Sequence, residues 1–145
     1  MRHTARLGRV LILGLVVLLT TSRASTVFAG LHVWTSNGPE GGKIYALVLD
    51  SGTPATLYAG SDGGVFKSTN GGDNWRESST GLTTRSIGCL AIGPATPTTL
   101  YAGTSGGVFK STDGGDNWGP ASTGLPTSTL VAALAVDPAT PATLY

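Results

Sequence analysis

The sequence predicts an all-β fold built from repeated four-stranded units. Residues 56–82 and 99–125 are copies of one block, and only six of its 27 positions differ. A third copy begins near the C-terminus, and Leu57, Leu100 and Leu144 lie 43 and then 44 residues apart. Each block consists of short apolar runs separated by turn residues. A period of about 40–50 residues with several short strands is typical of a β-propeller blade.

The first strand of each unit is a nearly continuous apolar run, as expected of a strand covered on both faces. A turn rich in proline and threonine follows each run, and proline cannot donate to a β-ladder, so these segments predict connections. Asp50 and Asp137 open two of these turns, and we expect them to cap the turns. The predicted first strands are residues 44–49, 87–92 and 130–136.

The next two strands of each unit are predicted to form a hairpin. The second strands are expected at residues 56–59 and 99–102, and the third strands at 65–68 and 108–111. The glycine pairs 63–64 and 106–107 separate them and predict the positive φ angles of a tight turn. A fourth strand of about four residues is expected to start at Trp75 and at Trp118.

The most specific motif lies between the third and fourth strands. It reads STNGGDNW at residues 68–75 and STDGGDNW at residues 111–118, and we call these two segments the box loops. At the third position, Asn or Asp accepts hydrogen bonds from backbone N–H groups further along, while the tryptophan buries a large apolar surface. The residues predicted to build the loops are Ser68, Asn70, Gly72, Trp75, Ser111, Asp113, Gly115 and Trp118.

The residue at the third position of the loop also argues against a catalytic or metal-binding role for that position. Asn70 stands where the second copy has Asp113, so the position needs an acceptor oxygen and no charge. We therefore expect a structural hydrogen bond at this position, and neither a metal ligand nor a general base.

Both box loops match the Asp-box pattern Ser-x-Asp-x-Gly-x-x-Trp, and over residues 31–145 the chain resembles Asp-box (BNR) repeat β-propellers. This group holds sialidases, xyloglucanase-type glycoside hydrolases, sortilin-like receptor ectodomains and photosystem II assembly factors. The resemblance implies a propeller of four-stranded antiparallel blades, with the box hairpin on the outer rim. Trp34 lies 41 residues before Trp75, so residues 31–36 are expected to form a fourth strand without a box loop. The predicted fold is a partial β-propeller with two complete blades and parts of a third.

Closure of such a propeller needs more blades than residues 30–145 contain. Propellers close with about four to eight blades, and 116 residues hold fewer than three units of this period. We expect further blades or self-association to complete the ring. An N-terminal piece of a longer protein is favoured over a head-to-tail oligomer, whose shared blade would have no third strand.

Residues 1–29 are typical of a secretory signal peptide. Three arginines precede an apolar run at residues 10–19, and a Val-Phe-Ala cleavage site ends at Ala29. The run is shorter than the roughly 20 residues that cross a bilayer, although an uncleaved anchor is the alternative. No membrane span is expected once the leader is removed, and the predicted location is secreted, periplasmic or cell-surface.

The net charge of residues 30–145 bears on the class of partner, and the single cysteine bears on whether the chain has a reactive thiol. Residues 30–145 carry five Lys and Arg residues against eight Asp and Glu residues, a net charge of −3. No basic patch remains, which argues against a nucleic-acid partner. Cys89 is the single cysteine and aligns with Ala46 and Ala133, so it is expected to be a small buried thiol.

The charged residues do not assemble the active site of the resembled enzymes. Sialidases need an arginine cluster, a tyrosine nucleophile with its glutamate, and an aspartate. Residues 30–145 offer two arginines, Arg76 and Arg85, one tyrosine outside the repeated pair, Tyr45, and two glutamates, Glu40 and Glu77. No catalytic, cofactor-binding or metal-binding residue is therefore predicted, and no cofactor is expected.

Specificity is expected in the loops that differ between the blades. These are Ser61-Asp62 against Thr104-Ser105, residues 76–78 against 119–121, and residues 37–42 against 83–86 and 126–129. The predicted function is a non-catalytic module that binds glycan or protein. The alternatives are the N-terminal fragment of an exo-acting glycoside hydrolase, sialidase- or xyloglucanase-like, and an assembly factor for a membrane complex.

Overall fold

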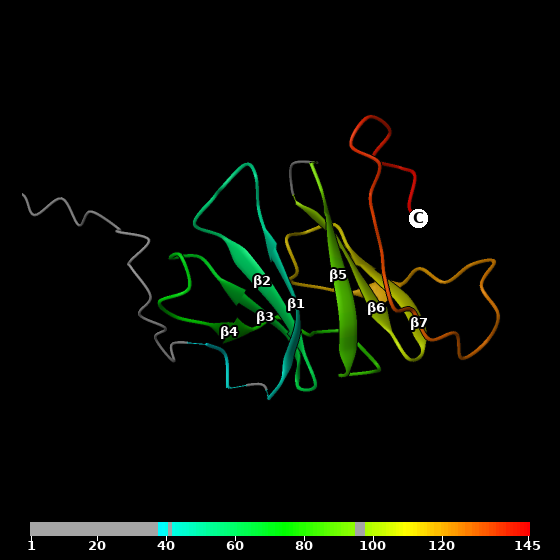
Figure 1. Cartoon of the computed structure of the whole chain (residues 1–145), viewed down its shortest axis with the longest axis horizontal. Helices are drawn as coiled ribbons and strands as arrows, with labels where there is room; N and C mark the ends of the chain where they lie inside the picture. Colours follow the sequence, from blue (N-terminus) through cyan, green and yellow to red (C-terminus); the bar gives the residue numbers. More distant parts are fainter. Residues whose placement is uncertain (1–37, 41, 95–97) are drawn as a thin grey trace, which may run out of the picture. The chain divides into compact units, whose positions relative to one another are not determined.

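The computed structural model describes residues 38–40, 42–94 and 98–145, and this part of the chain contains strands and no helix. The strands form two antiparallel four-stranded sheets, ordered β1-β2-β3-β4 and β5-β6-β7-β8, which we call blade 1 and blade 2. Figure 1 shows the two sheets side by side, with β1 next to β5. The all-β prediction with two four-stranded blades is confirmed. The bounds are β1 Ile44–Leu49, β2 Leu57–Ser61, β3 Gly64–Ser68, β4 Arg76–Glu77, β5 Ile87–Gly93, β6 Thr99–Thr104, β7 Gly107–Ser111 and β8 Gly119–Pro120.

The turn between the second and third strands uses one glycine and one hydroxyl group. Only the second glycine of each pair has a positive φ, 124° at Gly64 and 113° at Gly107. The hydroxyl of Ser61 accepts from the N–H of Gly63 at 3.0 Å and donates to the carbonyl of Gly64 at 3.1 Å. The prediction that both glycines would supply positive angles was wrong, because the side chain closes the turn.

The fourth strands are shorter than predicted. Both β4 and β8 span two residues and begin one residue after the tryptophan. In blade 1 the hydroxyl of Ser79 accepts from the N–H of Val65 at 3.0 Å and donates to its carbonyl at 3.1 Å. In blade 2 the hydroxyl of Ser122 likewise accepts from the N–H of Val108 and donates to its carbonyl. The N–H of Ser78 also donates to the Val65 carbonyl at 2.8 Å, so in blade 1 the Ser79 hydroxyl adds to the end of the backbone pairing.

The third unit is less regular than expected. Residues 130–136 do not form a strand and have one isolated bridge, between Val136 and Leu144. Ala135 and Tyr145 nevertheless exchange two backbone hydrogen bonds of 2.8 Å. The predicted strand was wrong in extent, because its partner contributes only residues 143–145 to the pairing. The expected signal peptide at residues 1–29 and the expected strand at 31–36 lie outside the described residues.

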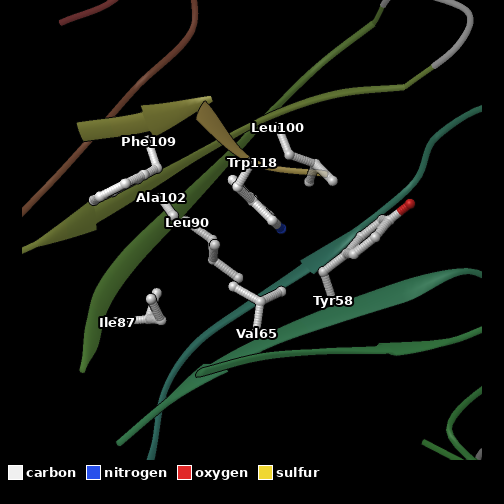
Figure 2. Close-up of a cluster of buried hydrophobic side chains, with 8 residues drawn as sticks. All are labelled: Tyr58, Val65, Ile87, Leu90, Leu100, Ala102, Phe109 and Trp118. Atoms are coloured by element: carbon white, nitrogen blue, oxygen red, sulfur yellow. The ribbon is translucent and has the colours of Figure 1, made fainter. Parts of the chain in front are cut away.

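The main hydrophobic core lies between the two blades (Figure 2). Tyr58 and Val65 of blade 1 meet six buried side chains of blade 2 there. Since side chains alternate along a strand, each blade has one face toward its predecessor and one toward its successor. The six blade 2 residues are Ile87, Leu90, Leu100, Ala102, Phe109 and Trp118.

A smaller core covers the opposite face of blade 2. Tyr101 and Val108 of blade 2 pack there with Val131, and Leu134 and Leu144 lie against them. These apolar residues of the third unit occupy the repeat positions that blade 2 uses against blade 1. Residues 131–144 thus act as the inner half of a further blade.

Among the described residues, none forms a blade against the face of blade 1 that would meet a preceding blade. Ile44 and Leu47 are 44% and 54% exposed, whereas their repeat equivalents Ile87 and Leu90 are 0% and 7% exposed. The same residue types are therefore buried in one blade and exposed in the other. A blade of this sequence needs a neighbour to bury its apolar face, as in other repeat arrays.

Candidate functional site

The first box loop closes on its own side chains. The hydroxyl of Ser68 accepts from the N–H of Gly72 at 2.9 Å and donates to Oδ1 of Asn70 at 2.9 Å. Oδ1 of Asn70 also accepts from the N–H of Asn74 at 3.0 Å. The predicted structural hydrogen bond at the third position is present in this loop.

The second box loop repeats this geometry and adds one bond. The hydroxyl of Ser111 accepts from the N–H of Gly115 and donates to the carboxylate of Asp113. The Asp113 carboxylate also accepts from the N–H of Asn117 at 2.9 Å. The other carboxylate oxygen accepts from the side-chain amide of Asn117 at 2.8 Å. The two Asn117 donors and the Ser111 hydroxyl lower the pKa of Asp113 to about 2. Asn70 preserves the backbone bond, so the loop tolerates either residue.

The two tryptophans differ in burial because only one has a described neighbouring blade behind it. Trp118 is 5% exposed, and its Nε1 donates to the carbonyl of Ser78 in blade 1 at 2.8 Å. Figure 2 shows its indole pointing toward blade 1. Trp75 is half-buried and lines a groove with Phe66 and residues 38–40. The expected burial is therefore found for Trp118 and only in part for Trp75.

Side chains of blade 1 donate hydrogen bonds to glycine carbonyls of the second box loop. The hydroxyl of Tyr58 and the ammonium of Lys67 both donate to the carbonyl of Gly114, at 3.0 Å and 2.8 Å. The ammonium also lies 5.4 Å from the centre of the Tyr58 ring, within the range of a cation–π contact. We call this arrangement of tyrosine and lysine the carbonyl clamp. Burial raises the pKa of Tyr58 to about 12, so the hydroxyl remains a donor.

Two further contacts reinforce the clamp. The hydroxyl of Ser78 donates to the carbonyl of Gly115 at 2.6 Å, and Arg76 pairs with Asp116 at 2.8 Å. A Cβ on Gly115 would lie 2.9 Å from the Ser78 hydroxyl, so this approach requires glycine. Sequence reasoning missed the clamp. The signal available was the Gly-Gly pair in each box loop together with the tyrosine and lysine repeated in each blade.

The opposite end of blade 1 holds charged and polar residues that do not recur in blade 2. Tyr45 donates to the Asp62 carboxylate at 3.2 Å, and both side chains are exposed. Hydrogen bonding to Asp62 raises the pKa of Tyr45. The repeat equivalents are Gly88 and Ser105, so blade 2 has neither partner. The sequence placed Tyr45 and Asp62 in separate segments and gave no sign of their pairing.

A second pair lies at the same end. Arg85 forms an ion pair with Glu77 and donates to the carbonyl of Gly63 at 3.4 Å. Since the Gly63 turn follows Asp62, this pair lies against the segment that carries the Asp62 carboxylate. The exposed surface at this end thus offers carboxylate, phenol and guanidinium groups to a polar ligand.

A groove of about 500 Å³ lies at the box-loop end between the blades. Asp50 lines it and caps its own turn, as predicted, by accepting from the N–H of Gly52 at 2.8 Å. It also accepts from the hydroxyl of Thr98 in blade 2 at 2.6 Å. That hydroxyl is the main cause of the lowered pKa of Asp50. The clamp residues Tyr58 and Lys67 form another wall, so the polar side chains named here are already bonded to other groups of the protein.

Cys89 shows no sign of a reactive site. The thiol is half-buried, where full burial was expected, and it lies 3.6 Å from the carbonyl of Val131. Burial raises its pKa, which disfavours the thiolate. Within the described ranges, no three His, Cys, Asp or Glu residues gather as metal ligands would. Nor does the described part contain a helix long and apolar enough to cross a membrane.

Comparison with known proteins finds similarity among solved structures. No family model and no curated protein matches this sequence. The crystal structure of an ancestral GH74 enzyme matches with 27% sequence identity and a TM-score of 0.58. The chain is similar to part of a β-propeller glycoside hydrolase. The match covers 68% of this chain and 14% of the GH74 enzyme, so the similarity concerns a small part of that protein.

Proposed function

We propose that this chain forms two blades of an Asp-box β-propeller glycoside hydrolase and that Asp62 supplies one of its two carboxyl groups. The observation that carries the proposal is the similarity to a GH74 enzyme over 68% of the chain. It favours the glycoside hydrolase alternative over the non-catalytic module that the sequence suggested first. We also propose export through the leader at residues 1–29, which suits action on a glycan outside the cell.

Asp62 is the carboxylate best suited to this role. Most glycoside hydrolases use a pair of carboxyl groups around the scissile bond. Three of the other carboxylates of the described hairpins are engaged in holding the structure: Asp113 closes a box loop, Asp116 pairs with Arg76, and Glu77 pairs with Arg85. Asp73 recurs as Asp116 and so belongs to the box motif itself. Asp62 lies in an exposed turn and, among the described residues, accepts only from the Tyr45 hydroxyl. Its replacement by Ser105 in blade 2 shows that blade construction does not require it.

The geometry suggests how Asp62 acts. The Tyr45 hydroxyl donates to one carboxylate oxygen, and no described residue donates to the other. An anion held this way can accept a proton from water or attack the anomeric carbon, depending on its distance from the second carboxyl group. That second group is proposed to come from outside the described blades. The blades described here are therefore expected to bind glycan and to leave it intact.

The proposal is tested with the protein expressed from its full reading frame. We would measure reducing-sugar release from xyloglucan and β-glucan oligosaccharides for the unmodified protein, Asp62→Asn and Asp73→Asn. Asp62→Asn should lower kcat by about 10²–10⁴-fold, the usual contribution of an acid–base group, with oligosaccharide binding retained. Asp73→Asn, in an exposed box loop, is the control and should keep its activity.

Two outcomes would contradict the proposal. Full activity in Asp62→Asn would remove Asp62 from the reaction. Tight oligosaccharide binding without hydrolysis by the unmodified protein would instead support the non-catalytic binding module.

A further inference from the structure

The groove between the blades at the box-loop end has hydrogen-bonding capacity beyond the bonds described above. Its volume of about 500 Å³ lies within the range of small-molecule sites, about 300–1,000 Å³. The three N–H groups of the Lys67 ammonium meet one described acceptor, the carbonyl of Gly114. Oδ2 of Asp50 accepts one described bond, from Thr98, and a carboxylate oxygen can accept about two. A charged donor and a charged acceptor therefore remain for a ligand.

Hydroxyl groups and an apolar ring also line the groove. Ser51 and Thr69 are exposed, and their hydroxyls bond to no other described residue. The ring of Pro94 supplies an apolar surface. A sugar matches this combination, because its hydroxyls both donate and accept hydrogen bonds while its C–H faces are apolar.

The charges of the groove favour a neutral ligand. Among the residues that line it, Lys67 carries the positive charge and Asp50 the negative charge. A ligand with a net charge would be attracted by one of these groups and repelled by the other. Neutral hydroxyl groups can accept from the ammonium and donate to the carboxylate without this conflict.

The groove continues along the box loop of blade 1. A smaller hollow of about 140 Å³ shares Lys67 and Thr69 with it. The two hollows form an extended polar surface, which suits a chain of several sugar units better than one small molecule. The other residues of the smaller hollow are Asn70, Asn74, Trp75 and Arg76.

Two residues of the groove do not belong to the repeat. Tyr58 recurs as Tyr101, whereas Gly93 occupies the position of Asp50 in the second unit. Alanine occupies the position of Thr98 in the other two units. The bond between Thr98 and Asp50 is therefore not required to build a blade, and the repeat does not explain the polar wall that these two residues form.

We propose that this groove is a binding site for a neutral oligosaccharide, separate from the Asp62 end of the blade. Tyr58 near the start of β2 lines the groove, and Asp62 follows the end of that strand. At about 3.3 Å per residue, the two ends lie about 13 Å apart along the strand. The site holds glycan without chemistry, so it does not depend on a catalytic role for Asp62.

The test is a nuclear magnetic resonance titration of the isotope-labelled full chain with two neutral probes, cellotetraose and mannotetraose. At least one probe should give saturable shifts of the backbone amide signals of Gly52 and Thr69, with the amide signal of Thr112 unmoved. Thr112 is the repeat equivalent of Thr69 and does not line the groove. The pattern of shifts therefore reports where the glycan binds as well as its Kd.

Matched substitutions test the named contacts. Thr69→Val removes one exposed hydroxyl and should raise Kd about threefold, whereas Thr112→Val should leave Kd unchanged. Asp50→Asn removes the charged acceptor and should raise Kd about tenfold. Asp137→Asn is its control, because Asp137 caps the corresponding turn of the third unit outside the groove. Circular dichroism of each variant separates loss of the site from loss of the fold.

The proposal would be overturned if neither neutral probe bound, or if Thr69→Val and Thr112→Val chains gave the same Kd. Tighter binding of tetragalacturonate than of either neutral probe would overturn the neutral class of ligand. Shifts confined to the turn at Gly63 would place the glycan at the Asp62 end, against this site and without harm to the proposed hydrolase. Conversely, groove binding by a protein that hydrolyses no glycan would support this site and contradict the proposed function.

Discussion

The indole Nε1 of Trp118 donates a 2.8 Å hydrogen bond to the backbone carbonyl of Ser78, 40 positions earlier in the chain. This bond joins the box loop of blade 2 to the fourth strand of blade 1. The tryptophan at the end of the motif therefore serves the contact between blades as well as its own hairpin. Its counterpart Trp75 has the same sequence context and is only half-buried.

We expect this difference in burial to separate the two tryptophans in stability. Trp118→Ala should lower the free energy of unfolding by about 3–5 kcal/mol, as large-to-small changes in a core do. Trp75→Ala should cost clearly less, because its ring is partly exposed. Urea unfolding followed by circular dichroism measures both. Equal losses in the two variants would show that the interface between the blades does not decide the effect.

The box-loop glycines offer a second matched pair. Gly72 and Gly115 have φ values of 95° and 88°, so an alanine at either position is strained by about 1–2 kcal/mol. A Cβ at Gly115 would also lie 2.9 Å from the Ser78 hydroxyl and 3.2 Å from the Tyr58 ring. A Cβ at Gly72 meets nothing closer than 3.9 Å. Gly115→Ala should therefore be the more destabilising in thermal unfolding, by about 1–3 kcal/mol of added crowding.

The hydroxyl of Tyr58 should make a measurable contribution to stability. Tyr58→Phe removes the 3.0 Å bond to the Gly114 carbonyl, which still accepts from Lys67. The expected loss is about 0.5–1.5 kcal/mol, the usual net contribution of one hydrogen bond. Tyr101→Phe is the control, and in the chain by itself it should change the unfolding free energy by less. A loss in Tyr101→Phe as large as that in Tyr58→Phe would argue against the clamp as described.

Asp113 should make stability depend on pH in acid. Its pKa is lowered to about 2 in the folded chain from a usual value of 3.8, so folding favours the ionised carboxylate. The stabilisation is present above the usual pKa and is lost as the pH falls through about 2. Asp113→Asn should flatten the dependence of the urea midpoint on pH over this interval. The reverse change in blade 1, Asn70→Asp, should steepen it, and no change in either slope would contradict the assignment.

The repeat allowed most of the fold to be predicted from sequence. The residues that form β1 were predicted with their observed bounds, because a continuous apolar run bounded by a Lys and an Asp has clear ends. The fourth strands were predicted too long, since nothing in the residue pattern shows that the strand ends at Glu77 and that the hydroxyl of Ser79 then binds Val65. The box-loop hydrogen bonds were predictable because they lie within four residues of one another.

The contacts that cross between distant segments were not predictable in the same way. The pairing of Tyr45 with Asp62 depends on how β1 bulges opposite β2 between Ile44 and Ala46. The hydrogen bond from Lys67 to the carbonyl of Gly114 depends on how one blade packs against the next. Periodicity locates the strands but does not specify which side chains meet across an interface.

The contacts of Arg76 and Ser78 have a consequence for assembly. Chains made of nearly identical hairpins can join the wrong neighbours while they fold. Arg76 and Ser78 hold the second box loop, yet both lie among the six positions at which the two copies differ. The second hairpin, with glycine and alanine at these positions, cannot replace the first without losing both contacts. These two side chains therefore favour the correct order of the blades during folding. Most other residues of the two repeated blocks are identical and cannot do so.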